Sequence, residues 1–255
     1  MALHREAVQH KSPLRKAGSV LRTLWFLTLW FASGQSIALT QEQVFAGAET
    51  LYRQRLTELD SQHNLDSDAA FHSRVTRIYQ ALLAQAILDN PQTMAWPWEL
   101  HTTADAEESA SCMAGGRLLV SDNYVRRLRL SDSELAMLIS HEMQHAILMH
   151  HQKELEEAVR LDPHWERHSF AALQDAVDND IALMTRLSDF NALQETEADE
   201  QGMRMAQSAG WLPRLMVTYF RKAARASAYP NFSSLAHPSP ASRWARMRVF
   251  ANLLR

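Results

Sequence analysis

The sequence is poor in three residue types whose abundance would indicate other classes of protein. Its 255 residues include one cysteine, 7 glycines and 8 prolines. With Cys112 alone, the chain can form neither an internal disulfide nor a cysteine-based zinc site. The low glycine and proline content excludes collagen-like and low-complexity chains.

An excess of charge of one sign is also missing. The formal net charge is −3 at pH 7, from 26 Lys and Arg against 29 Asp and Glu. This balance gives no electrostatic basis for binding nucleic acid or an anionic membrane surface. The hydrophobic fraction of 46% is enough for a real core, and the length fits one domain, with or without appendages.

The N-terminal apolar run, LWFLTLWFA at 24–32, is far too short to cross a membrane as a helix of about 20 residues. It follows a basic stretch and precedes the small residues Ser36 and Ala38. This order is typical of a secretory signal peptide. We predict a signal peptide over 1–38, cleaved after Ala38, and a single domain over 39–255. The alternative is an uncleaved segment that anchors the protein in the inner membrane.

The rest of the sequence has a mostly helical pattern. Thr40 and Gln43 form a capping box at the start of a predicted helix. Apolar residues at helical spacing, together with the punctuation by Gly and Pro, predict helices over 40–59, 68–90, 131–160, 163–190, 191–210, 213–228 and 241–255. Short strands are predicted over 98–103 and 117–121, and a loop over 229–240. The predicted fold class is α+β, with many helices and one small sheet.

The helix predicted over 131–160 carries the sequence HEMQHAILMHH. Within it, His141, Glu142 and His145 form H-E-x-x-H. Positions i and i+4 share one helix face, so two imidazoles can reach one zinc ion. Glu142 beside them can take a proton from a metal-bound water. Surface histidines on a polar face are the alternative, and the strongly patterned, capped helix favours the metal site.

Two ligands and a base leave a third ligand to be found. His151 occupies the position of the last histidine of the metzincin pattern, but that pattern needs a glycine where this chain has Leu148. Since nothing in the sequence stops the helix, we predict that His150 and His151 are solvated and do not reach the metal. Glu166 lies at roughly the distance of the glutamate ligand in thermolysin-like enzymes, but without their surrounding pattern.

Glu195 is the better candidate for the third ligand. It forms E-x-x-x-D with Asp199, so the two carboxylates lie on one helix face, one turn apart. Glu195 can supply a carboxylate ligand, and Asp199 can accept the free ring N–H of a zinc-bound histidine. An acidic, solvated helix face is the alternative, and the H-E-x-x-H sequence upstream favours the metal site.

Five motifs in the same order resemble those of the metallopeptidases grouped with the CAAX prenyl protease and HtpX, peptidase family forty-eight. Within that family the chain looks most similar to the periplasmic BepA- and LoiP-like branch. The motifs are HEMQH at 141–145, ETEAD at 195–199, AGGRLLVSDNYV at 114–125, AGWLPRLMV at 209–217 and HPSPASR at 237–243. The resemblance covers about residues 43–254. Ala114, Ser109 and Gln144 depart from the family pattern, and none of the three is an expected ligand.

The resemblance implies a mostly helical zincin-like domain with one small sheet beside the active-site helix. It implies one zinc ion held by His141, His145 and Glu195, with Glu142 as the base. His237 would lie near the metal, as a further ligand or as a stabiliser of the transition state. Arg243 would hold this region by charge-assisted hydrogen bonds. The substrate-binding edge would consist of Gly115, Gly116, Arg117, Leu118, Leu119 and Val120, to which an extended peptide adds as a strand.

The function implied by the resemblance is that of a periplasmic zinc endopeptidase, free or peripheral to a membrane, without tetratricopeptide repeats. Its substrates would be misfolded or stalled envelope proteins, outer-membrane proteins above all, with their assembly machinery as a partner and no nucleic acid. Two alternatives remain. One is a chaperone-like module that binds unfolded clients and has a closed zinc site, and the other is a protease anchored in the membrane.

Overall fold

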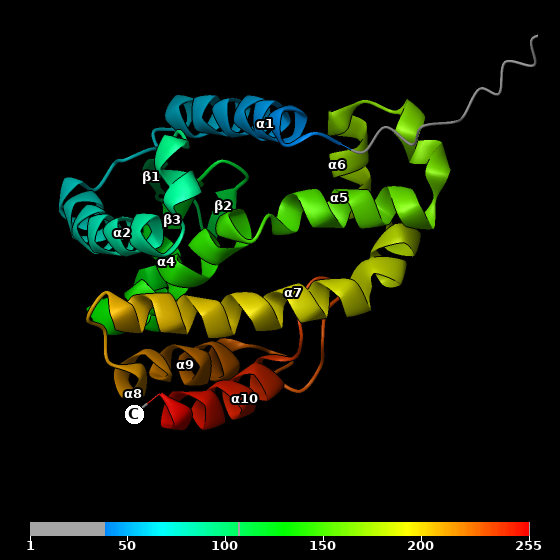
Figure 1. Cartoon of the computed structure of the whole chain (residues 1–255). Helices are drawn as coiled ribbons and strands as arrows, with labels where there is room; N and C mark the ends of the chain where they lie inside the picture. The colour runs from blue at the N-terminus through cyan, green and yellow to red at the C-terminus, as the bar shows by residue number, and fades with distance from the viewer. Residues whose placement is uncertain (1–38, 107, 255) are drawn as a thin grey trace, which may run out of the picture. The chain divides into compact units, whose positions relative to one another are not determined.

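The computed structural model describes residues 39–106 and 108–254 (Figure 1), so the predicted signal peptide at 1–38 lies outside the described residues. The long helices at the N-terminal end are α1 (Gln41–Ser61) and α2 (Ala69–Asp89), and both predicted helices are confirmed. The remaining α-helices are α3 (Asp122–Leu128), α4 (Asp132–Ile147), α5 (His150–Leu161), α6 (Phe170–Asn179), α7 (Ile181–Ser208), α8 (Pro213–Met216), α9 (Thr218–Ala226) and α10 (Pro240–Leu253). Two 3-10 turns, η1 (Pro91–Ala95) and η2 (Pro163–Arg167), complete the helical elements of the described chain. The α+β, mostly helical fold class is confirmed.

Side-chain caps fix the starts of the two helices on which most of the architecture depends. At α1, the Gln43 backbone N–H donates to Thr40 Oγ1 over 3.2 Å, and the Thr40 N–H donates to Gln43 Oε1 over 2.9 Å. At α4, Ser131 and Glu134 form the same reciprocal pair. Each capping box satisfies N–H groups that the first turn of a helix leaves without partners. The predicted helix starts are therefore confirmed.

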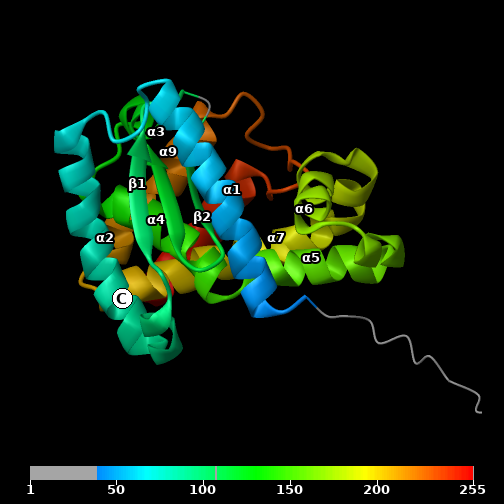
Figure 2. The same cartoon turned by 90° about the horizontal axis from the view of Figure 1, so that it is seen from above.

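One small sheet lies between α1 and α4 (Figure 2). Its strands are β1 (Glu99–Thr103), β2 (Ala110–Met113) and β3 (Arg117–Ser121), in the order β1-β3-β2. β1 is parallel to β3, and β2 is antiparallel to it. The tight turn between β2 and β3 needs Gly115 and Gly116, whose φ angles are 82° and 84°. At Gly116, a Cβ would lie 2.3 Å from the Trp98 ring, so a side chain cannot be accommodated there.

The sheet order corrects the prediction of a substrate-binding edge. β3 contains Arg117, Leu118, Leu119 and Val120, and it is paired with a neighbour on both sides and buried along its whole length. The other two predicted residues, Gly115 and Gly116, form the turn before it. A strand paired on both sides has no backbone N–H or C=O left for a peptide. The outer strands of the sheet are β1 and β2, and of these two only β2 has all of its residues in the lining of the cavity that contains the candidate ligands. Its four residues ASCM were too short and too weakly patterned to predict from sequence.

The predicted helix over 131–160 is broken. α4 ends at Ile147, Met149 adopts a left-handed conformation with φ of 57°, and α5 starts at His150. Neither Gly nor Pro marks this break, and the packing of α5 against α6 and α7 overrides the local helical pattern. The region predicted as a helix over 163–190 likewise divides into η2, α6 and the start of α7, and the one predicted over 213–228 divides into α8 and α9.

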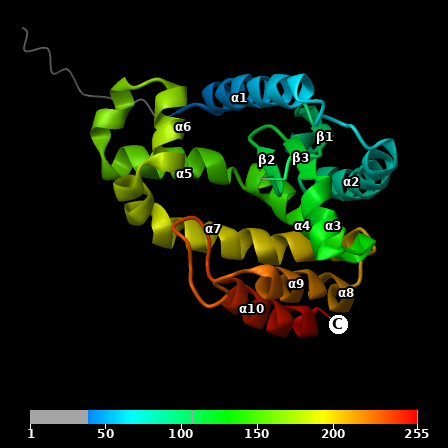
Figure 3. The same ribbon diagram turned by 180° about the vertical axis from the view of Figure 1, so that it is seen from behind.

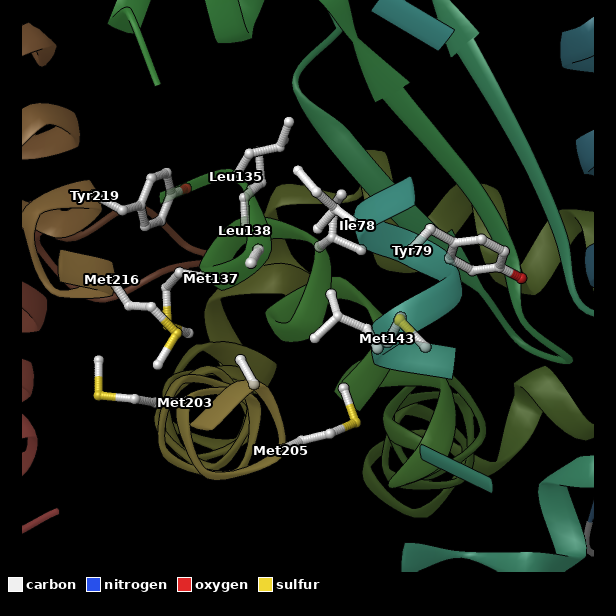
Figure 4. Close-up of a cluster of buried hydrophobic side chains, with 14 of the residues drawn as sticks. Ile78, Tyr79, Leu135, Met137, Leu138, Met143, Met203, Met205, Met216 and Tyr219 are labelled. Atoms are coloured by element: carbon white, nitrogen blue, oxygen red, sulfur yellow. The ribbon is translucent and has the colours of Figure 1, made fainter. Parts of the chain in front are cut away.

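The main core is formed where α2, α4, α7 and the C-terminal helices meet (Figure 4). Its labelled side chains are Ile78 and Tyr79 from α2, Leu135, Met137, Leu138 and Met143 from α4, Met203 and Met205 from α7, Met216 from α8 and Tyr219 from α9. From behind, α7 runs between α4 on one side and α9 with α10 on the other (Figure 3). Among the described residues, no helix combines the length and apolarity that a bilayer crossing requires.

At Gly202 the backbones of α4 and α7 approach each other closely. A Cβ at this position would lie 3.0 Å from the backbone nitrogen of His141 and 3.1 Å from its Cα. The missing side chain thus allows the backbones of the two helices to pack directly against each other. This contact sets the distance between the α4 face that carries His141 and the α7 face that carries Glu195.

Candidate metal centre

Two histidines one turn apart on α4 direct their ring nitrogens to one point. The Nε2 atoms of His141 and His145 are 3.2 Å apart, and the rings meet edge to face. His141 is buried and His145 is half-buried. Their placement on one face follows from the i, i+4 spacing in the middle of a capped helix.

Glu195 reaches the same point from α7. Its Oε1 lies 3.1 Å from His145 Nε2, and its Oε2 lies 3.6 Å from His141 Nε2. The three donor atoms lie within 4.8 Å of one another, and they form the one candidate metal group found in the described part of the chain. Two imidazole nitrogens and a carboxylate oxygen are a known zinc donor set. Lone pairs that converge from three buried or half-buried groups repel one another unless a cation or proton lies between them, so the residues fit zinc.

Asp199 and Arg243 support these ligands from behind. Arg243 donates to Asp199 through Nε over 2.9 Å and through Nη2 over 2.6 Å, which is a bidentate pair. Asp199 Oδ1 also lies 2.9 Å from His141 Nδ1, within hydrogen-bonding distance. A carboxylate in this position favours the tautomer with hydrogen on Nδ1 and leaves Nε2 free for a metal. Both predicted supporting residues are thus brought to the site.

Glu195 is held in its charged form by its neighbours. Burial by itself would raise its pKa, but the adjacent His141, His145 and His237 and the Arg243 guanidinium lower that pKa well below its usual range. Oε2 lies 3.1 Å from Arg243 Nη1 and 3.1 Å from His237 Nδ1, yet it is buried and makes no well-aligned hydrogen bond. A buried carboxylate oxygen with this incomplete pairing is suited to bind a cation.

Glu142 faces the same point without joining the group of three. One of its carboxylate oxygens lies 4.0 Å from His141 Nε2. Burial raises the pKa of Glu142 above its usual value. A carboxylate with a raised pKa is well suited to accept a proton and to give it up again.

His237 comes from the loop at 227–239, between α9 and α10. Its Nδ1 lies 3.1 Å from Glu195 Oε2, and its side chain is 58% exposed. The structure therefore brings this predicted site residue to the carboxylate of Glu195. The Glu195 carboxylate beside it is the largest cause of a raised pKa of His237.

The prediction that His150 is solvated is wrong. The break at Met149 turns His150 inward, where it is 2% exposed and its Nδ1 lies 3.2 Å from His145 Nδ1. Its Nε2 lies 3.3 Å from Glu197 Oε2 on α7. Burial, followed by the neighbouring His145, lowers the pKa of His150 to about 3. The misprediction arose because no glycine marks the break that redirects this side chain.

His151 and Glu166, the other residues considered as third ligands, both lie apart from the candidate metal group. His151, also predicted to be solvated, is only partly exposed: its Nε2 contacts the Gln174 side chain, and its ring meets the Phe170 ring edge to face. It makes no described contact with the three candidate ligands. Glu166 lies in η2, is exposed, and is not part of the group of three.

A cavity of about 670 Å³ opens over the site. Glu142 lines its floor together with the candidate ligands, and the whole of β2 forms one wall. Ser121 N–H donates to Ser109 C=O, and Gly116 N–H donates to Met113 C=O, so these two carbonyls point toward β3. Because the backbone groups of a strand alternate in direction, those of Ala110 and Cys112 point to the free edge.

Comparison with known proteins agrees with this geometry. Residues 70–250 match the family described as Peptidase family M48. The chain is 27% identical over 199 residues to the beta-barrel assembly-enhancing protease of Yersinia pestis. The matched region covers 70% of this chain and 41% of the relative. It is 26% identical over 187 residues to the protein of that name from Escherichia coli K12, covering 68% of this chain and 38% of the relative.

A plant relative shows the same kind of similarity. The chain is 29% identical over 168 residues to the mitochondrial metalloendopeptidase OMA1 of Arabidopsis thaliana, covering 62% of this chain and 32% of the relative. The chain spans about two fifths or less of the length of all three relatives.

Proposed function

The chain belongs to peptidase family M48, and on that basis we propose that it is a zinc-dependent endopeptidase. The observation that carries this proposal is the convergence of His141 Nε2, His145 Nε2 and a Glu195 carboxylate oxygen within 4.8 Å, with the Glu142 carboxylate beside them. His141, His145 and Glu195 would hold the zinc ion. The set leaves room for water and substrate, as expected of a catalytic zinc site rather than a structural one.

Zinc and Glu142 would have separate roles in the hydrolysis. When bound, zinc polarises the scissile carbonyl and makes a water molecule more acidic. Glu142 accepts the proton of the attacking water at its carboxylate and then returns it to the nitrogen of the departing amine. The buried surroundings that raise the pKa of Glu142 favour this second transfer. The side chains of Arg243 and Asp199 keep His141 oriented while this happens.

His145 is oriented by a different partner from that of His141. For Nε2 of His145 to face the metal, its ring hydrogen must be on Nδ1. His150 Nδ1, 3.2 Å away, accepts that hydrogen, and His150 then donates from Nε2 to the Glu197 carboxylate at 3.3 Å. His150 is thus a positioning residue, which acts on the metal only through His145.

The substrate binds as an added strand on β2. Ala110 and Cys112, whose backbone groups point away from β3, both line the cavity over the metal centre. Main-chain pairing holds an extended peptide with little regard to its sequence. This placement replaces the earlier expectation that β3 receives the peptide.

The cellular role follows the names of the relatives. Two of them are called beta-barrel assembly-enhancing proteases, so misfolded or stalled outer-membrane proteins are the proposed substrates, and their assembly machinery is the proposed partner. We also propose a periplasmic location, reached through a signal peptide over 1–38 that is cleaved after Ala38. N-terminal sequencing of the exported protein tests this, and a start at residue 1 would favour the anchored alternative.

The test of the catalytic proposal is Glu142→Gln, which keeps the shape of the side chain and removes the base. The variant should bind one zinc per chain and leave casein uncut. The matched control is Glu58→Gln, on an exposed face of α1, which should cut casein at the wild-type rate. Wild-type hydrolysis by Glu142→Gln would show that another group supplies the base.

A second candidate function is favoured by the contact between His237 and Glu195. A loop histidine 3.1 Å from a candidate ligand can close the site, and the protein would then bind unfolded clients without cutting them. In that case His237→Ala would hold zinc and clients but release no peptide fragments. Hydrolysis that appears or increases in His237→Ala would instead identify the protein as a protease gated by this loop.

A further inference from the structure

A second cavity, of about 580 Å³, lies on the C-terminal side of the metal centre. Aromatic rings make up much of its wall, with Tyr124 from α3, Tyr219 and Phe220 from α9, and Tyr229 and Phe232 from the following loop. Tyr229 and Phe232 are 72% and 73% exposed, so the rim offers apolar surface to a ligand. We call this space the aromatic cavity.

The aromatic cavity adjoins the cavity over the metal centre. Four residues line both of them: Tyr124, Tyr219, His237 and Arg243. His237 and Arg243 are also the residues that approach Glu195 Oε2, each at 3.1 Å. A group that enters the aromatic cavity therefore contacts the same two side chains that approach the candidate ligand Glu195.

Three polar groups of the lining, those of Tyr124, Tyr219 and Arg243, already have partners. The hydroxyls of Tyr124 and Tyr219 lie 3.3 Å apart and bond to each other. Arg243 is paired with Asp199 and Glu195. The remaining cation, Arg127, is exposed and stacks over the Tyr124 ring at 5.5 Å. No acidic residue is among the described residues that line the cavity.

This chemistry selects one class of occupant. An apolar surface with satisfied hydroxyls gains most from a large apolar group, and aromatic rings pack well against aromatic walls. Arg127, with no acidic residue in the described lining to offset its charge, disfavours a basic group. We propose that the aromatic cavity receives a large apolar side chain, aromatic by preference, of the substrate residue that flanks the scissile bond. This inference rests on the proposed endopeptidase function and names its substrate preference.

The test uses matched peptides that differ at a single residue, which is Phe, Leu, Ala or Lys. Binding is measured by fluorescence anisotropy to zinc-loaded Glu142→Gln, in which no turnover interferes. The Phe peptide should bind roughly tenfold to a hundredfold more tightly than the Ala peptide, as expected for burial of a large apolar side chain. The Lys peptide should show no gain over the Ala peptide.

A second substitution ties the preference to the cavity. Ala223 of α9 is part of the lining, and Ala223→Phe fills the space. In this background the ratio of Phe to Ala affinities should fall at least about tenfold. Ala245→Phe, on the exposed face of α10, is the matched control and should keep the wild-type ratio. Circular dichroism confirms that both variants fold.

The outcomes separate this inference from the proposed function. Equal binding of the Phe and Ala peptides, or a ratio unchanged by Ala223→Phe, overturns the inference. A change of oligomeric state in Ala223→Phe would show that a second copy of the chain covers the cavity, and this would overturn it too. If the wild type cuts all four peptides equally well, the inference fails and the endopeptidase function stands. If it cuts none while Glu142→Gln still prefers Phe, the endopeptidase function fails.

Discussion

The Nδ1 atoms of His145 and His150 lie 3.2 Å apart, across the break between α4 and α5. His145 is one of three groups that converge on the candidate metal position, and His150 is buried behind it. His141, on the same helix, instead faces the Asp199 carboxylate. The two histidines of one H-E-x-x-H motif, both candidate ligands, therefore have different supports, a carboxylate for one and an imidazole backed by Glu197 for the other.

Replacement of His150 should weaken zinc binding without removing a ligand. In His150→Leu, Nδ1 of His145 loses its acceptor, and zinc affinity should fall about 10- to 100-fold, the usual effect of losing such a partner. His150→Asn should lose less, because an amide oxygen near the place of Nδ1 can accept the same hydrogen. Competition with a chromogenic chelator measures both affinities.

The matched control for this experiment is the neighbouring histidine. His151→Leu removes an imidazole that contacts Gln174 rather than a ligand. Its zinc affinity should stay within about twofold of that of the wild type, a change well below the usual effect of losing a partner of a ligand. Equal losses in His150→Leu and His151→Leu would show a general disturbance of α5 and refute the specific role of His150.

Gly202→Ala should destabilise the protein and weaken zinc binding together. Helix propensity alone predicts a gain of about 1 kcal/mol for this substitution. The added Cβ, however, would lie 3.0 Å from the backbone of His141, where nothing flexible can yield. Separation of α4 from α7 should cost about 1–3 kcal/mol of unfolding free energy and move Glu195 away from the histidines. Urea unfolding shows whether Gly202→Ala lowers or raises the free energy of unfolding. A variant more stable than the wild type would contradict the close packing of α4 against α7.

His101 should make stability depend on pH above neutrality. Its Nδ1 lies 2.5 Å from Asp66 Oδ2, and its Nε2 lies 3.0 Å from Glu99 Oε1. The hydrogen bond to Asp66, the largest cause, raises the pKa of His101 above its usual 6.5. The protonated form is thus favoured by folding, so its contribution is complete below pH 6.5 and is lost as pH rises through the raised pKa.

The corresponding measurement compares wild type with His101→Asn by urea unfolding between pH 6 and pH 9. The difference in unfolding free energy should be largest at pH 6 and should narrow as the pH rises. A difference that stays constant, or that widens, would mean that the histidine is not protonated in the fold.

If the substrate pairs with β2 as a strand, N-methylation of its backbone should affect KM at every second residue. In an added strand, every second N–H of the peptide points to the free edge of β2, and the others point away. Single N-methylations along a peptide substrate should therefore raise KM strongly at alternate positions and weakly between them. A uniform effect along the peptide would exclude binding as a strand.

Local patterns in the sequence were sufficient for the features that depend on neighbouring residues. Capping boxes at Thr40 and Ser131 involve residues three positions apart, and H-E-x-x-H lies within a single helix. Glu195 and Asp199 were found because the i, i+4 spacing gives both residues the same helix face. These geometries need no knowledge of the tertiary fold.

Features that depend on distant segments were missed. β2 is only four residues long, and its place at the sheet edge depends on pairing with β3. The break at Met149 has no glycine or proline to mark it, because its cause is the packing of α5 against helices that come later in the chain. The burial of His150 follows from that break, so both errors about this stretch have one origin.

The contact between His150 and the candidate ligand His145 depends on the left-handed backbone conformation of one residue, Met149. Its left-handed backbone costs an L-residue with a side chain roughly 1 kcal/mol, a cost that glycine does not bear. Met149→Gly should thus be accepted readily, whereas a β-branched residue such as Ile would favour a continuous right-handed helix. Such a helix would carry His150 away from His145, with every ligand residue still present in the sequence. A substitution at residue 149 is therefore expected to weaken metal binding without changing any of the candidate ligands.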